Sequence, residues 1–186
     1  MLKPVRAFPS LARRVAVVRS AVHAVLTREL FALRRAVEAY PDDASLWRCP
    51  PGLPNSGGTL VLHLAGNLQH FVGAVLGGTG YRRDRDAEFA RRDVPREALL
   101  AEIDATLAAV DRGLEAVQDE TLASLYPEVI SGRTVATGDW LVHLAAHLAY
   151  HLGQLDYHRR VVTGDSRSIG ALAVAELPTP LSTRAG

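Results

Sequence analysis

Three histidines, His143, His147 and His151, are spaced four residues apart within a stretch that is otherwise almost wholly apolar. A helix turns by about 100° per residue, so this spacing predicts a helix with all three imidazole rings inside an arc of roughly 80°. No charged residue lies between Trp140 and Leu155, which indicates that such a helix is buried on most of its sides. A buried imidazole needs partners for both ring nitrogens. Three of them on one face can share a single partner, and a divalent metal ion is the obvious one.

The rest of the chain also has helical periodicity. Apolar residues recur at intervals of three and four from Val15 to Val37, which predicts a first helix that ends at Pro41. Later helices are expected from about Thr59 to Leu76, from Pro95 to Val117, and from Thr137-Gly138-Asp139, which offers N-cap chemistry, to about Val162. Between them, residues 79–94 predict a loop and residues 120–138 a connector with short turns.

Four amphipathic helices without strand alternation predict an all-α fold, namely a four-helix bundle. We expect one domain over residues 1–165 and a poorly patterned C-terminal tail over residues 166–186, where Pro178 and Pro180 disfavour regular structure. The first residues are interpreted as a leader into the first helix and not as a signal peptide.

Composition and charge limit the possible partners. With 48% hydrophobic and 22% charged residues the chain is typical of a globular protein, and a net charge of +1 favours neither nucleic acid nor an anionic membrane. The basic cluster from Tyr81 to Arg85 is interrupted by Asp84 and is interpreted as a solvated loop. The single cysteine, Cys49, excludes an internal disulfide and fits a reducing compartment, and no apolar run reaches the ~18 residues that a membrane span needs. We therefore expect a cytoplasmic protein that binds neither nucleic acid nor a membrane.

The second expected helix carries its own polar face. Between Leu60 and Leu76 the polar residues include His63, Asn67 and His70, which fall within roughly 60° of one another on a helix. If this face meets the histidine face of the fourth helix, the bundle interior contains a cluster of imidazoles. Metal sites in helix bundles are built in this way, from side chains on facing helices.

Spacing alone leaves the choice of ligands open. Two overlapping pairs, His143 with His147 and His147 with His151, can each clamp one ion, so His147 is the best candidate. The third ligand is expected from the second helix, as either His63 or His70.

Other features limit the chemistry. No glutamate follows the first histidine of either pair, so the helical metalloprotease motif is absent. Neither polar face carries Asp or Glu, so no catalytic residue can be named from the sequence. His158 lies beside Arg159 and Arg160 and is expected at the surface.

Several motifs are similar to those of a known family. They are Asn55-Ser56 before the second helix, Leu62-His63-Leu64-Ala65-Gly66-Asn67 within it, Glu88-Phe89, the stretch from Phe31 to Trp47, Gly138-Asp139-Trp140-Leu141, and the segment His147 to Tyr157. With these motifs, over roughly residues 10–165, the chain resembles the DinB superfamily of bacterial four-helix metal-binding proteins. The pattern His-x-x-x-His-x-Gly-Gln in the fourth helix is the most specific of them.

The resemblance implies a metal site made by one histidine of the second helix and two of the fourth. Carried over by position, the ligands are His63, His147 and His151. His143 and His70 then become residues behind the ligands or in the core, and Asn67 is a candidate to orient a ligand or a water molecule. Three neutral imidazoles leave open coordination positions and suit Zn, Ni, Fe or Co.

The resemblance also implies a metal-dependent enzyme. A transferase acting on a low-molecular-weight thiol is favoured slightly, because a metal that stabilises the thiolate reduces the need for a general base. The alternatives are a metal-dependent hydrolase and a non-catalytic bundle whose histidines are structural or support dimerisation. We expect a small-molecule substrate and, from the apolar surplus of the first helix, a homodimer.

Overall fold

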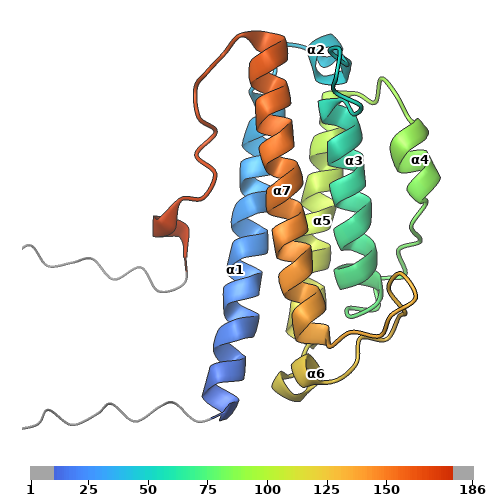
Figure 1. The fold of residues 1–186 in the computed structure, drawn as a ribbon, viewed down its shortest axis with the longest axis vertical. Coiled ribbons are helices and arrows are strands. Elements are labelled where there is room, and N and C mark those ends of the chain that lie inside the picture. Colours follow the sequence, from blue (N-terminus) through green and yellow to red (C-terminus); the bar gives the residue numbers. More distant parts are fainter. Residues whose placement is uncertain (1–10, 178–186) are drawn as a thin grey trace, which may run out of the picture.

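A computed structural model of the chain describes residues 11–177 (Figure 1). The body of the molecule consists of α1 (Leu11–Glu38), α3 (Gly57–Leu68) continued by the π-helix η1 (Gln69–Ala74), α5 (Arg96–Ala116) and α7 (Thr137–Thr163). The shorter elements are α2 (Asp43–Trp47), α4 (Arg85–Ala90), α6 (Asp119–Ala123) and the 3-10 turn η2 (Val174–Glu176). The prediction of an all-α four-helix bundle is confirmed, and within residues 11–177 extended pairing is limited to isolated bridges.

The long helices share one apolar core. α1 packs against α5 and α7, and α3 packs against the same two helices (Figure 1). On α1 the side chains of Leu26, Leu30, Leu33 and Val37 are fully buried, as their spacing predicts. α3 differs from the other helices because all of its residues are buried, with α4 against it as a further neighbour. A polar residue on α3 therefore lies inside the molecule.

The helix expected from Thr59 to Leu76 is present, but only its first part is an α-helix. From Gln69 to Ala74 the backbone widens into a π-helix, and the N–H of Gly77 still donates to the carbonyl oxygen of Val72 five residues earlier. Helix α5 packs closely against this π-helical segment. A Cβ atom on Gly113 of α5 would collide with the carbonyl oxygen of Val72, so the two backbones are in direct contact.

Two segments predicted as irregular contain short helices. Residues 79–94 include α4, which begins where the side chain of Asp84 accepts a hydrogen bond from the N–H of Ala87 at 2.9 Å. Residues 120–138 overlap α6, which ends at Ala123. Helices of five or six residues carry too few apolar repeats to be detected by periodicity.

The prediction that a side chain of Thr137-Gly138-Asp139 caps the last helix is wrong. α7 begins after Ala136, which has no capping side chain, and the Thr137 hydroxyl donates instead to the carbonyl oxygen of Ser124 at 3.1 Å. The hydroxyl thus ties the start of α7 to the segment that follows α6.

The chain after α7 packs back onto the bundle as far as Ile169, whose side chain is buried in the core. The guanidinium of Arg35 donates to the carbonyl oxygen of Ile169 at 2.9 Å. The division into a domain of residues 1–165 and a tail of residues 166–186 stays a prediction. The N-terminal leader, residues 1–10, and the end of the tail, residues 178–186, lie outside the described residues. Within the described part, no helix has both the length and the hydropathy that crossing a membrane requires.

Candidate metal centre

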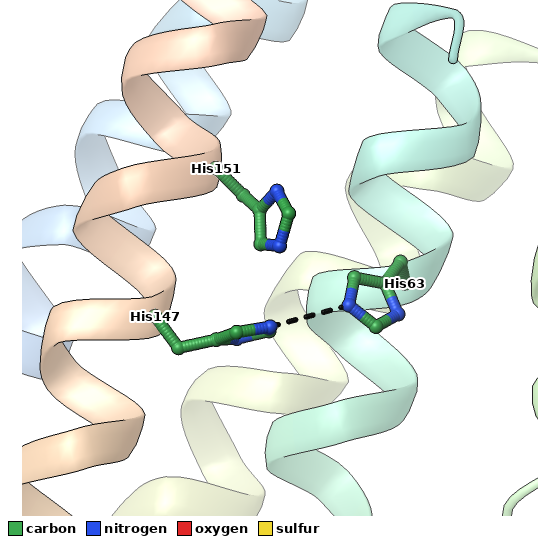
Figure 2. A group of neighbouring side chains, drawn as sticks. All are labelled: His63, His147 and His151. Atoms are coloured by element: carbon green, nitrogen blue, oxygen red, sulfur yellow. Dashed lines mark hydrogen bonds between the residues drawn. The ribbon is translucent and has the colours of Figure 1, made fainter. Parts of the chain in front are cut away.

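Three histidines from two helices meet inside the bundle. His63 comes from α3, and His147 and His151 come from successive turns of α7. One ring nitrogen of each lies within 4.8 Å of the others, and Figure 2 shows the three rings turned toward one another across the gap between the helices. Among the residues that the structure describes, these are the three that meet the geometry of a metal site.

Hydrogen bonds on the outer side of two rings leave their inner nitrogens free. Nδ1 of His63 lies 3.0 Å from Oε2 of Glu88, and Nδ1 of His151 lies 2.6 Å from Oε1 of Gln154. Both partner oxygens are acceptors, so each Nδ1 carries the proton and each Nε2 keeps its lone pair. Nε2 of His63 lies 3.3 Å from Nε2 of His147, along the dashed line in Figure 2.

Burial favours the neutral form of the two α7 histidines, His147 and His151. Burial, together with the nearby His151 and His63, lowers the pKa of His147 from 6.5 to about 4. Burial also lowers the pKa of His151, although its hydrogen bond with Gln154 acts in the opposite direction. A neutral imidazole is the form that binds metal ions. Three imidazole nitrogens at this separation fit a divalent cation of the zinc, nickel or iron type.

A carboxylate that sequence reasoning missed lies behind His63. Glu88, on α4, is 6% exposed and receives two hydrogen bonds from Arg83, at 2.7 and 2.9 Å, besides its contact with His63. Burial acts to raise the pKa of Glu88, but the hydrogen bonds from His63 and Arg83 outweigh it and lower this pKa below its ordinary value. Arg83 is therefore part of the centre, and the interpretation of residues 81–85 as a solvated loop is wrong for this residue.

Gly66 provides the space for Glu88. A Cβ atom at position 66 would collide with Oε1 of Glu88, so α4 can bring its carboxylate against α3 only at a glycine. In the sequence, Gly66 and the Glu88-Phe89 step are the signals of this close approach.

A cavity of about 390 Å³ opens beside the three histidines. Its wall includes Asn67, Trp140, His143, Arg83 and Arg85, and no carboxylate of the described residues lines it. Asn67 is buried, and its Oδ1 atom has no hydrogen-bond partner among the described residues. His143 is exposed and stacks on Trp140 with a ring-centroid distance of 4.8 Å. The structure thus brings Asn67 and His143 to the cavity next to the candidate ligands.

Two other histidines lie elsewhere. His70, on η1, does not line the cavity, and its Nε2 atom lies 3.0 Å from Oε2 of Glu128. His158 was expected at the surface, but it is 2% exposed. Its Nε2 donates to the carbonyl oxygen of Arg48 at 2.7 Å, and its Nδ1 accepts from the Tyr40 hydroxyl at 2.7 Å. His158 is therefore a hydrogen-bonded core residue.

Comparisons with known proteins agree with this arrangement. No curated protein matches the chain. A solved structure, a DinB-like protein from Bacillus cereus ATCC 10987, has a similar fold with a TM-score of 0.55 and 18% sequence identity, over 73% of this chain and 87% of that chain. Residues 25–155, which include the three histidines, match the sequence profile of the DinB superfamily. The chain therefore belongs to the DinB superfamily.

Proposed function

We propose that the chain is a metal-dependent enzyme that transfers a low-molecular-weight thiol, with one divalent ion held by His63, His147 and His151. The observation that carries the proposal is the meeting of three imidazoles, with ring nitrogens within 4.8 Å, at the wall of a cavity that no carboxylate of the described residues lines. Catalytic metal sites typically have three protein ligands and one coordination position left open for water or substrate, whereas structural sites have a fourth protein ligand in that position.

The chemistry that a bound ion supplies at such a site is stabilisation of a thiolate. In the transfer, the sulfur forms a bond to an electrophilic carbon of the acceptor, the bond from that carbon to its leaving group breaks, and the thiol proton goes to solvent. The transfer needs no general base on the protein. This suits the cavity, because the nearest carboxylate, Glu88, is already engaged by His63 and Arg83.

The cavity wall also suits an anionic substrate. Arg83 is neutralised by Glu88, but Arg85 forms no ion pair among the described residues and lies over the ring of Phe89, 5.0 Å from its centroid. Asn67 offers an unpaired acceptor from the wall. A small thiol with a carboxylate and a hydrogen-bond donor would use both groups.

Elemental analysis of protein purified without chelator or metal-affinity tag tests the first half of the proposal. We expect about one equivalent of metal in the wild type, none in His63→Ala or His147→Ala, and a wild-type amount in His23→Ala, whose exposed ring contacts Asp111 away from the centre. Absence of metal from the wild type, after addition of Zn²⁺, Ni²⁺ or Fe²⁺ as well, would contradict the proposal and favour a structural histidine cluster.

A measurement of thiol consumption tests the proposed transferase activity. The metal-loaded protein is incubated with a panel of small thiols and an alkyl halide acceptor, and free thiol is measured over time. We expect consumption above the uncatalysed rate in the wild type and in His23→Ala, and none in His147→Ala. Stoichiometric metal without thiol consumption would argue against a transferase and reopen the hydrolase alternative. The homodimer and the cytoplasmic location stay predictions.

A further inference from the structure

The buried carboxylate of Glu88 and the two other histidines of the centre lie on opposite sides of the His63 ring. Nδ1 of His63 faces Oε2 of Glu88 at 3.0 Å, whereas Nε2 of the same ring faces Nε2 of His147 at 3.3 Å. A neutral imidazole carries one proton, and a carboxylate can only accept. Nη2 of Arg83, which can only donate, lies 3.5 Å from the same Nδ1, but the Glu88 oxygen is the nearer partner at 3.0 Å. The proton is therefore on Nδ1, and the lone pair is on Nε2, toward His147 and His151.

We propose that Glu88 is the positioning residue of this centre, which fixes the tautomer and the orientation of His63 so that its Nε2 is available to a metal ion. The inference rests on the proposed metal site. It gives a role to Glu88, which lies on α4 outside both polar helix faces and which the resemblance named only as part of the Glu88-Phe89 step.

Arg83 holds the carboxylate in its charged form and in one orientation. Its guanidinium donates to both oxygens of Glu88, at 2.7 and 2.9 Å, and its carbon lies 5.5 Å from the ring centroid of Phe71. Arg83 lies in the segment before α4, and Phe71 lies on η1. A two-point contact of this kind fixes the plane of the carboxylate as well as its charge. The acceptor offered to His63 therefore has one geometry.

The backbone around Glu88 is adapted to this contact. Asp84 caps the start of α4, which sets the direction of that helix four residues before Glu88. Gly66 on α3 leaves room for the carboxylate, which a Cβ atom would displace. Three independent features, namely the arginine fork, the helix cap and the glycine, thus position one side chain behind one histidine.

The chain contains a matched pair for comparison. His70 and Glu128 form the same kind of contact, with Nε2 and Oε2 3.0 Å apart, but the two side chains are 23% and 41% exposed, and no arginine of the described part of the chain pairs with Glu128. This pair does not line the cavity. Changing Glu128 therefore removes a histidine–carboxylate contact without touching the centre.

Nitrogen NMR of the imidazole rings in the metal-free protein tests the positioning directly, with His63 assigned through a His63→Gln variant. We expect His63 to be protonated at Nδ1 in the wild type and in Glu128→Ala, and to become a mixture of tautomers in Glu88→Ala. A His63 ring that stays fully Nδ1-protonated in Glu88→Ala would overturn the inference. This measurement needs no metal, so it decides the role of Glu88 even if the proposed metal site fails.

Metal affinity is the second measurement, with Zn²⁺ titrated into the metal-free protein. We expect Glu88→Gln, which keeps the size of the side chain, to weaken Zn²⁺ binding by about 10- to 100-fold, and Glu128→Gln to bind as the wild type does. Gly66→Ala, which keeps the carboxylate but displaces it, is expected to weaken binding similarly while circular dichroism shows a folded helical protein. Affinity of Glu88→Gln within twofold of the wild type would overturn the inference. A wild type that binds no Zn²⁺ would instead refute the metal site, and the tautomer measurement would still stand.

Discussion

Nε2 of His63 and Nε2 of His147 lie 3.3 Å apart, although the two residues are 84 positions apart in the sequence. Since Nδ1 of His63 donates to Glu88, the lone pair on Nε2 of His63 faces the His147 ring. The other nitrogen of His147, Nδ1, is buried and has no hydrogen-bond partner within residues 11–177. His147 is thus the least satisfied of the three rings, and its low pKa keeps it from gaining a proton in place of a metal ion.

Metal binding is expected to raise the melting temperature, because an ion held by two helices binds the folded state and not the unfolded chain. At a free Zn²⁺ concentration 100 times the Kd, the stabilisation is about 2.7 kcal/mol, which corresponds to about 5–10 °C for a chain of this size. Differential scanning calorimetry with Zn²⁺ and with a chelator measures the difference. We expect the increase in melting temperature with Zn²⁺ to be absent in His147→Ala and present in His23→Ala. An unchanged melting temperature in the wild type would argue for a histidine core without metal.

The long helices and the histidine faces could be predicted because both follow from local periodicity. The interval of four residues between His143, His147 and His151 places their rings on one face whatever the helix packs against. Spacing left open whether His63 or His70 is the third ligand, and only the tertiary structure decides between them. These two residues lie about two helical turns apart on the same face of one helix, and the structure turns only His63 toward α7.

Glu88 and His158 could not be predicted because long-range contacts determine their surroundings. Glu88 reaches the centre through a six-residue helix that packs against α3. His158 is buried next to Arg159, which is itself 1% exposed because it pairs with Asp156 at 2.8 Å and Asp165 at 3.5 Å. Neighbouring arginines suggest a surface only when they lack such partners.

Two glycine substitutions are expected to change stability in opposite directions. Gly113→Ala places a Cβ atom against the backbone of Val72 and should lower the free energy of unfolding by about 1–3 kcal/mol or more. Gly153 lies on the exposed side of α7, and no atom lies within 4 Å of the methyl group that Gly153→Ala would add. This substitution should raise the free energy of unfolding by about 0.5–1 kcal/mol. Urea unfolding of both variants measures these changes. Equal effects of the two substitutions would contradict the close contact between α5 and η1.

The metal-free protein is expected to lose stability as the pH falls below about 6.5. Burial, which outweighs the hydrogen bond to the Arg48 carbonyl, lowers the pKa of His158 below its ordinary value of 6.5. Between the two pKa values the unfolded chain binds a proton that the folded protein does not, so acid favours unfolding by up to about 1.4 kcal/mol per pH unit for such a group. Above pH 6.5 both states are neutral at this residue and the contribution is constant.

Urea unfolding at pH 7.0 and pH 5.5 tests the role of His158. His158→Gln is expected to be less stable than the wild type at pH 7.0, because the Tyr40 hydroxyl loses its nearer acceptor at 2.7 Å and keeps only the Leu155 carbonyl oxygen at 3.3 Å. The variant is also expected to lose less stability between the two pH values. His23→Ala, which changes an exposed ring, is the control. A pH dependence in His158→Gln that equals the wild type would show that His158 does not titrate on unfolding.

Reversing the charge of Arg85 is expected to weaken the binding of an anionic thiol without affecting the metal. Arg85 lines the cavity and forms no ion pair among the described residues, so its charge is available to a substrate carboxylate. A charge-assisted hydrogen bond contributes about 1.5–3 kcal/mol, so Arg85→Glu should raise KM for such a thiol at least about tenfold. Arg82→Glu makes the same charge change on an exposed residue that does not line the cavity, and should leave KM within a factor of about two. Steady-state kinetics of both metal-loaded variants, with metal content measured in parallel, separates a local contact from a general effect of charge. A similar rise in KM in both variants would mean that the substrate senses only the net charge of the surface, and the assignment of Arg85 to the substrate would be wrong.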